Sequence, residues 1–457
     1  MTTSRWWCEH AWLGGDAVAD AVTVTVTDGV VTALQPDSPR TGTTLRGLVI
    51  PGLANAHSHA FHRALRSRTQ RDRGSFWTWR KLMYAAAGRL TPDLYRELAR
   101  AVYAEMALAG ITAVGEFHYL HHDTGGRPYS DPNAMGHALI DAAREAGIRL
   151  TLLDTCYLSS GVDGAPLGDG PQQRFGDGDG HAWAERVESL KAPDGVLVGA
   201  AIHSVRAVPL TEMAPVVDWA ARHGAPLHIH SSEQTAEVDQ CLVVHGCTPT
   251  ALMRDNGVLG ARTTAVHATH LTERDIDDMR STATGVCFCP TTERDLGDGV
   301  GPAPALIDGS GPFSLGSDSH AVIDLFEEAR AVELDERLFR RERGLLAAPR
   351  LLETATIDGH RALGWSDAGA LRIGARADLV AIDLESIRTA GGGATVETAV
   401  FACTAADVTD VVVDGRHVVA DRTHMDIPNT GAVLAAAIAA VMEEPPRLEN
   451  PPGLEKR

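Results

Sequence analysis

Two hydrophobic patterns divide the chain. Near the N-terminus apolar and polar residues alternate, so that Val22, Val24 and Val26 fall on one face of an extended segment before the turn signal Asp28-Gly29. Residues 371–421 show the same alternation, with strand patterns over 378–382 and 411–413. We therefore predict that the two ends of the chain, residues 1–50 and 371–457, pair into one small β-sandwich domain.

In the middle of the chain, short apolar strands alternate with amphipathic helices. One predicted helix has Thr91 as its N-cap and Pro92 in its first turn, and it ends at Gly110; another begins at Thr272. Strands are predicted at 48–54, 111–117, 149–155, 197–203, 225–230, 263–267, 283–289 and 312–318. Eight strand–helix units in about 270 residues match the size of a (β/α)8 barrel, although an open doubly wound sheet shows the same alternation. We predict an α/β fold with a (β/α)8 TIM barrel in residues 51–370, a loop over 161–180 and a loosely ordered tail after about residue 435.

The composition excludes several classes of protein. The net charge of −19 argues against a nucleic-acid surface. The chain contains no stretch of about 18 apolar residues, the length needed to cross a membrane, and its N-terminus lacks the apolar segment of a signal peptide. A cytoplasmic protein is therefore expected. Seven cysteines do not form a disulfide framework, and the apolar run around Cys287 and Cys289 favours buried small side chains over metal ligands.

Candidate chemistry lies at the ends of the predicted strands. His57 and His59 follow an apolar run, and because side chains alternate along a strand, both imidazoles project to the same side and can share one metal ion. Further candidates at strand ends are His203, Arg206, His230, Glu233, His267 and Asp318. Each has an ordinary structural explanation, such as a buried core histidine or a helix N-cap. Along the chain, predicted strands one, five, six and eight end in the order His-x-His (His57 and His59), His-x-x-Glu (His230 and Glu233), His (His267) and Asp (Asp318). This order is harder to explain by separate structural roles than any one of the residues.

This ordered set resembles the amidohydrolase superfamily, and the resemblance covers essentially the whole chain, including residues 374–380 at the return into the small domain. It implies that His57, His59, His230 and Asp318 hold a divalent metal ion with one position open to water. Some members bridge two metals with a carboxylated lysine after strand four. Here Lys191 precedes that strand and the next lysine is Lys456, so we expect a single ion, with zinc as the first choice and iron or manganese as alternatives.

The resemblance also implies the catalytic roles. Asp318 accepts the proton of the attacking water, His267 hydrogen-bonds that water, and Glu233 carries a proton to the substrate nitrogen. Single-metal members with His-x-x-Glu on strand five mostly hydrolyse C=N bonds.

Residues 58–61, 76–84, 116–122 and 203–209 resemble, more narrowly, the formimidoylglutamate deiminase family. That resemblance implies a small dicarboxylate substrate, N-formimino-L-glutamate, and a homodimer. Arginine binds carboxylates through a bidentate fork, which makes Arg206 and Arg80 the candidate carboxylate ligands. The remaining candidates for substrate binding are Tyr119, His203 and His62, the last at a position where the family usually has glutamine.

Alternatives remain open. The sequence is as consistent with a surface ion pair at Arg80, with Trp77 and Trp79 in the core, as with a carboxylate ligand. A deaminase of guanine, cytosine or a related ring would use the same metal ligands. A non-catalytic relative is disfavoured, because such relatives usually lose metal ligands and here the whole set is present.

Overall fold

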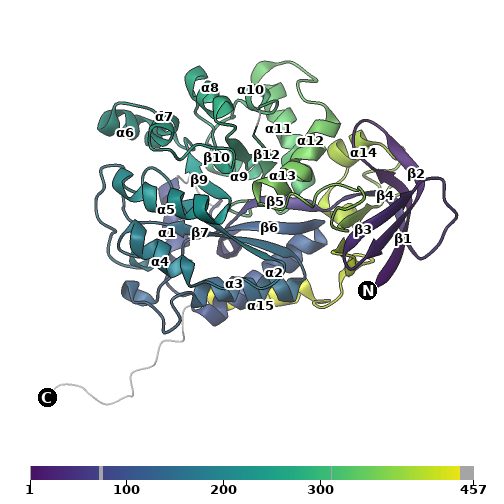
Figure 1. Cartoon of the computed structure of the whole chain (residues 1–457), viewed down its shortest axis with the longest axis horizontal. Helices are drawn as coiled ribbons and strands as arrows, with labels where there is room; N and C mark the ends of the chain where they lie inside the picture. The colour runs from purple at the N-terminus through teal and green to yellow at the C-terminus, as the bar shows by residue number, and fades with distance from the viewer. Residues whose placement is uncertain (1, 71–75, 310, 443–457) are drawn as a thin grey trace, which may run out of the picture.

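The computed structural model describes residues 2–70, 76–309 and 311–442, without the side chains of residues 76–78 (Figure 1). Eight parallel strands form the predicted barrel, each paired with the next in chain order. They are β5 (Leu53–Ser58), β6 (Ile111–His118), β7 (Arg149–Cys156), β8 (Val196–Ile202), β9 (Leu227–Ser231), β10 (Thr263–His267), β11 (Gly285–Phe288) and β12 (Phe313–Leu315). A parallel bridge between Ser58 and Asp318 joins the last strand end to the first, so the barrel is nearly closed.

Helices cover the outside of the barrel. Before β9 these are α1 (Phe76–Ala87), α2 (Pro92–Leu108), α3 (Ala134–Ala146), α4 (Gly180–Glu188) and α5 (Leu210–His223). After β9 follow α6 (Thr235–His245), α7 (Pro249–Asp255), α8 (Glu273–Ser281), α9 (Pro290–Leu296), α10 (Ala303–Leu306), α11 (Leu325–Arg340), α12 (Ala348–Ala355) and α13 (Ile357–Ala362). The two predicted helix starts are confirmed: Thr91 Oγ1 accepts from the backbone N–H of Leu94 at 3.3 Å, and Thr272 forms a capping box with Asp275.

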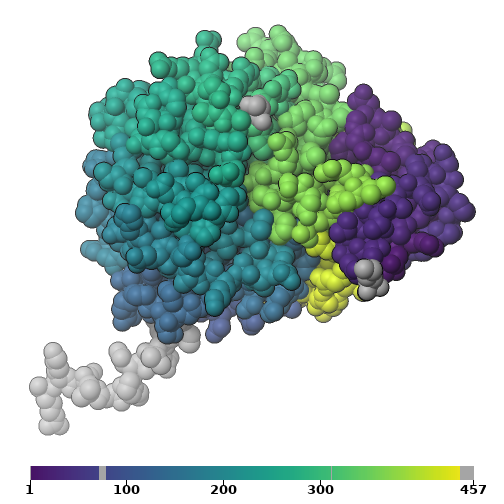
Figure 2. All heavy atoms as spheres, in the orientation of Figure 1, coloured from purple at the N-terminus to yellow at the C-terminus, as the bar shows by residue number. Residues whose placement is uncertain are grey.

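The N-terminal strands and the strands after residue 378 share a second sheet, as predicted, and this sheet lies at one side of the molecule (Figures 1 and 2). Its strands are β1 (Thr3–Trp12), β2 (Val18–Thr27), β3 (Val30–Gln35), β4 (Thr43–Pro51), β13 (Leu379–Ile382), β14 (Val408–Val413), β15 (Arg416–Ala420) and β16 (Thr423–His424), with the short helix α14 (Val396–Phe401) between β13 and β14. They form one continuous sheet in the order β16-β15-β14-β13-β4-β1-β2-β3. The antiparallel pair β4–β13 joins the N-terminal strands to the C-terminal ones.

The structure corrects two predicted boundaries. The strand predicted at 48–54 is two strands: residues 48–51 end β4 in the second sheet, and the first barrel strand begins only at Leu53. Gly52 separates them at a close approach of Thr112 and Asp378, where an added Cβ atom would lie 2.2 Å from Thr112 Oγ1 and 2.8 Å from Asp378 Cβ, so a larger residue here would force its neighbours to move. The tail predicted to be loose after residue 435 begins as a helix, α15 (Thr430–Met442), which packs on α2; residues 443–457 lie outside the described part.

A buried ion pair connects the barrel to the second sheet. Arg149, at the start of β7, is 2% exposed and donates to both carboxylate oxygens of Asp378, which directly precedes β13. Arg149 also donates to Asp414 at 3.0 Å. Burial alone would raise the pKa of Asp378, but the Arg149 guanidinium holds it below its ordinary value.

Asp378→Asn is expected to lower the free energy of unfolding by about 3–5 kcal/mol, because it leaves the buried Arg149 guanidinium without its main counter-charge. Chemical denaturation measures this change. Asp367→Asn is the control, since Asp367 pairs with Arg376 at the surface, where an ion pair contributes about 0–1 kcal/mol. Equal losses in the two variants would contradict a special role for the buried pair.

Among the described residues, we find no helix that combines the length and the apolar character needed to cross a membrane.

Candidate active site

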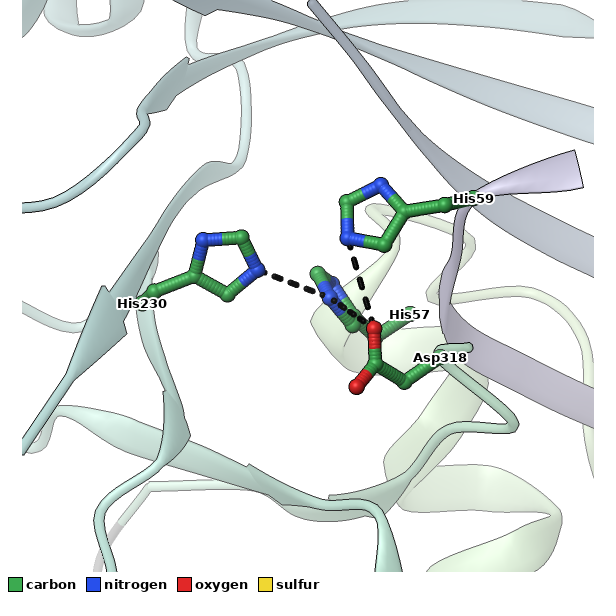
Figure 3. A group of neighbouring side chains, drawn as sticks. All are labelled: His57, His59, His230 and Asp318. Carbon is green, nitrogen blue, oxygen red and sulfur yellow. Dashed lines mark hydrogen bonds and ion pairs between the residues drawn. The ribbon is translucent and has the colours of Figure 1, made fainter. Parts of the chain in front are cut away.

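Four side chains from distant parts of the sequence meet at the C-terminal end of the barrel (Figure 3). His57 and His59 come from the end of β5, His230 from β9, and Asp318 from the segment after β12. Asp318 Oδ1 lies 3.3 Å from His59 Nε2 and 3.4 Å from His57 Nε2, and the Nε2 atoms of His57 and His230 are 3.1 Å apart. One ligand atom from each of the four residues lies within 4.8 Å of every other. The geometry therefore brings the predicted metal ligands together.

The hydrogen bonds of these residues fit a metal ion. His59 Nδ1 donates to the carbonyl of Phe117 at 3.0 Å and His230 Nδ1 donates to the carbonyl of His203 at 2.9 Å, so each neutral ring turns its Nε2 lone pair toward the centre. Burial lowers the pKa of His59 to about 3 and that of His230 well below its ordinary value. Burial would raise the pKa of Asp318, but His57 and His267 lower it, so this residue is a carboxylate. Neutral imidazoles and an ionised carboxylate are the protonation states that a divalent cation requires.

The backbone is strained where it presents these groups. The φ angles of Ser232, His267 and Asp318 are 52°, 68° and 42°, in the left-handed region that non-glycine residues rarely adopt. Gly316, two residues before Asp318, lies so close to His57 that a Cβ atom would be 2.7 Å from its Cβ. The fold therefore stores strain at the strand ends that aim the functional side chains.

The two predicted proton-handling residues lie beside the metal ligands. His267 Nε2 is 3.9 Å from both Glu233 Oε1 and Asp318 Oδ2. Burial raises the pKa of Glu233, although the charges of His267 and Arg206 oppose this effect, so the site favours the protonated form of Glu233 more than water does. Burial would lower the pKa of His267, but the carboxylates of Glu233, Glu293 and Asp318 raise it well above its ordinary value.

A cavity opens beside this group and is lined by all the residues predicted to bind substrate: His62, Arg80, Tyr119, His203 and Arg206. Aromatic side chains complete its wall, namely Trp79, Tyr84, Tyr157 and Phe175. Arg80 Nε donates to Tyr84 OH at 2.7 Å, and Arg206 Nε donates to Glu237 Oε2 at 2.6 Å. The alternative that places Trp77 in the core concerns a side chain outside the described part of the structure.

His62 contacts Tyr119, and both side chains line the cavity. Its Nε2 atom is 2.8 Å from Tyr119 OH, and burial lowers the pKa of its ring well below the ordinary value. The imidazole is therefore neutral, and it holds the phenol group of Tyr119 at the cavity wall.

Two carboxylates that sequence reasoning missed support the site. Glu116 accepts from Ser58 Oγ and from the backbone N–H of Ala60, both at 2.7 Å, and so fixes the chain on both sides of His59. Burial raises the pKa of Glu116 to about 7. Glu293 lies 3.2 Å from His267 Nδ1 and orients that ring. For Glu116 the sequence does contain one indication, because a glutamate inside the apolar run 111–117 is expected to be buried, and a buried charge needs partners.

Other histidines and the predicted buried cysteines lie around the site. His320 contacts Ser58 and Ser317, while His121 and His122 lie in a separate buried cluster with Asp154 and Asp177. Cys287 and Cys289 are buried, as predicted. The ligand atom of Cys289 lies within 4.8 Å of those of His267 and Asp318.

Comparison with known proteins defines the class of this enzyme. Residues 48–418 match the model of the amidohydrolase family, so the chain belongs to that family. It is a metal-dependent hydrolase that acts on carbon–nitrogen bonds, and its His/Asp cluster provides a set of ligands for the metal.

Individual relatives extend over most of the chain. It is 39% identical over 414 residues to the formimidoylglutamate deiminase of Pseudomonas aeruginosa, which covers 87% of this chain and 90% of that protein. It is 30% identical over 386 residues to the 8-oxoguanine deaminase of the same organism, covering 82% and 83% of the two chains. The crystal structure of an amidohydrolase from Brucella melitensis superposes with a TM-score of 0.88 and 32% identity, covering 96% of this chain and 100% of that one.

Proposed function

We propose that this enzyme hydrolyses N-formimino-L-glutamate to N-formyl-L-glutamate and ammonia. One divalent cation, with zinc as the first choice, is held by His57, His59, His230 and Asp318. The 39% identity to a formimidoylglutamate deiminase supports the substrate class. The observation that carries the proposal is that Arg80 and Arg206 line a cavity beside Glu233 in a chain with a net charge of −19. Two guanidinium groups in an otherwise acidic protein favour a substrate with two carboxylates.

The residues around the ligands account for the proton transfers. When bound, the divalent cation supplies Lewis acidity, which makes water a stronger nucleophile at neutral pH. Asp318 accepts the proton of the attacking water, and His267 stabilises the negative charge on the attacking oxygen. Glu233 in its protonated form donates to the imine nitrogen. As the water oxygen bonds to the amidine carbon, the carbon–nitrogen double bond becomes a single bond and the nitrogen becomes an amine. The proton held by Asp318 then passes to this amine. The carbon–nitrogen bond breaks and ammonia leaves, while the hydroxyl group becomes the formyl oxygen and returns its proton to Glu233.

The direct test of the proposal is ammonia release by the metal-loaded enzyme. We expect kcat/KM for N-formimino-L-glutamate to exceed that for 8-oxoguanine and 5′-methylthioadenosine by at least about 10³-fold, because sites that pair buried polar groups with a substrate discriminate by about 10⁴–10⁵ against analogues that lack the partner. Turnover of a purine without turnover of N-formimino-L-glutamate would reject the proposal and assign the enzyme to ring deamination.

Arg206→Met is expected to lower kcat/KM for N-formimino-L-glutamate by about 10–100-fold, mainly through KM, because a charge-assisted hydrogen bond contributes about 1.5–3 kcal/mol. Steady-state kinetics measure this change. Arg127→Met is the control, since the Arg127 side chain is 76% exposed and does not line the cavity. An unchanged KM in Arg206→Met would exclude Arg206 as a carboxylate ligand.

A further inference from the structure

Glu237 connects two of the loops that form the cavity. It lies in the first turn of α6, and its side chain is 1% exposed. Its Oε2 atom accepts from Arg206 Nε at 2.6 Å, and its Oε1 atom accepts from the backbone N–H of Ser232 at 2.9 Å. One buried carboxylate therefore has a separate donor on each oxygen.

Each of these contacts holds a functional group. Arg206 follows β8 and lines the cavity, with its Nη2 atom 3.9 Å from Glu233 Oε2. Ser232 directly precedes Glu233 and has a φ of 52°, a strained conformation that depends on its surroundings for support. The backbone N–H of Ser232 and the Arg206 guanidinium are thus fixed relative to each other through Glu237.

We propose that Glu237 is a positioning residue that couples the substrate-binding arginine, Arg206, to the proton donor, Glu233. This inference rests on the proposed function, since it assigns Arg206 to a substrate carboxylate and Glu233 to the departing nitrogen. Glu237 makes its contacts with Arg206 and Ser232 and acts on the substrate only through its two neighbours. Its carboxylate sets how far the anionic end of the substrate lies from the group that protonates the imine.

Only a carboxylate can make both contacts. Arg206 Nε–H and Ser232 N–H are donors, and an ionised glutamate presents an acceptor oxygen to each. A glutamine of the same shape has one acceptor oxygen and an NH₂ group, so one of the two donors would face another donor. Glu237→Gln therefore keeps the packing of the side chain but loses one contact.

The test is a pair of kinetic measurements on the metal-loaded enzyme with N-formimino-L-glutamate. Glu237→Gln is expected to raise KM about 10-fold and to lower kcat about 10-fold, because displacements of about 1 Å in a site can change rates by about 10²-fold. In the Arg206→Met background, Glu237→Gln is expected to change KM less than about twofold while kcat still falls, since only the contact with Ser232 then remains to be lost. Glu237→Asp keeps the charge beside Arg206 and serves as a second variant, because its shorter side chain cannot reach both donors.

Glu333 provides a matched control in the same chain. This buried glutamate of α11 accepts from Arg337 Nε at 2.6 Å and from the backbone N–H groups of Gly344 and Leu346, and it does not line the cavity. Glu333→Gln is expected to lower Tm without changing KM or kcat.

The outcomes separate the possible failures. Wild-type kinetics in a folded Glu237→Gln enzyme, or a fall in Tm like that of Glu333→Gln with KM and kcat unchanged, would overturn the role of Glu237 while the proposed function stands. Additive effects on KM in the double variant would also overturn the coupling. A wild-type enzyme that does not turn over N-formimino-L-glutamate overturns the proposed function and, with it, this inference.

Discussion

Glu233→Gln is expected to lower kcat about 10³-fold with little change in KM and no loss of bound metal. The carboxyl group is buried beside His267 and Asp318, and burial raises its pKa, which favours the protonated form that donates to the substrate. Glutamine keeps the shape but has no acidic proton, and positioned acid–base groups contribute about 10²–10⁴-fold to rates. Single-turnover kinetics with metal analysis of the same sample measure the effect.

Glu273→Gln is the control for this variant, since Glu273 lies exposed in the first turn of α8. Because the metal ligands are untouched in both proteins, metal content should be equal. If metal-loaded Glu233→Gln retained full turnover, the proton would have to come from another group, and the assignment of Glu233 would be wrong.

Removal of the divalent cation by a chelator is expected to reduce activity to background, and one equivalent of zinc per chain should restore it. Four buried ligand atoms lie within 4.8 Å of one another, two of them imidazole nitrogens 3.1 Å apart, and a shared cation would offset the repulsion between lone pairs that point at the same centre. His230→Asn should prevent restoration at the same zinc concentration. Metal analysis and ammonia release measure both effects.

His137→Asn serves as the control, because His137 pairs with Asp131 at the surface. Full activity in a chelated sample without bound metal would contradict the metal site. Restoration that needs two equivalents per chain would contradict a single ion, and restoration by iron or manganese alone would correct the choice of zinc.

Sequence periodicity was sufficient for the architecture, and the exceptions have local causes. The barrel strands after the first agree with prediction to within a few residues, because each is a short apolar run bounded by turn residues. The first strand was misplaced because residues 48–58 are almost continuously buried although they belong to two sheets, so burial alone shows no boundary. Helix α15 was missed because an alanine-rich segment before prolines has no strong amphipathic pattern; its partner, α2, is far away in sequence.

Some residues of the candidate site could be predicted from the sequence, and others could not. His57, His59, His230, Glu233 and Asp318 could be found from the sequence, because metal ligands and proton carriers are rare residue types placed at strand ends. Glu116 stands out in the sequence as a glutamate within an apolar run, which indicates that it needs partners but not which ones. Glu237 and Glu293 give no such signal, because a carboxylate that holds another residue has no motif. Its partners are recognised only when β6, α6 and α9 pack against the other strand ends.

What the sequence determined by itself is the class of fold, the candidates for the metal ligands and the residue types available to the cavity, since periodicity and ligand chemistry are local properties of the chain. Only the tertiary structure decided the protonation states of these groups and the orientation of their side chains. Burial keeps His59 and His62 neutral and favours a proton on Glu233, while contacts between loops distant in sequence orient Arg206 and His267. The physical reason is that pKa and orientation depend on which charges and dipoles surround a group in space, and this is set by packing.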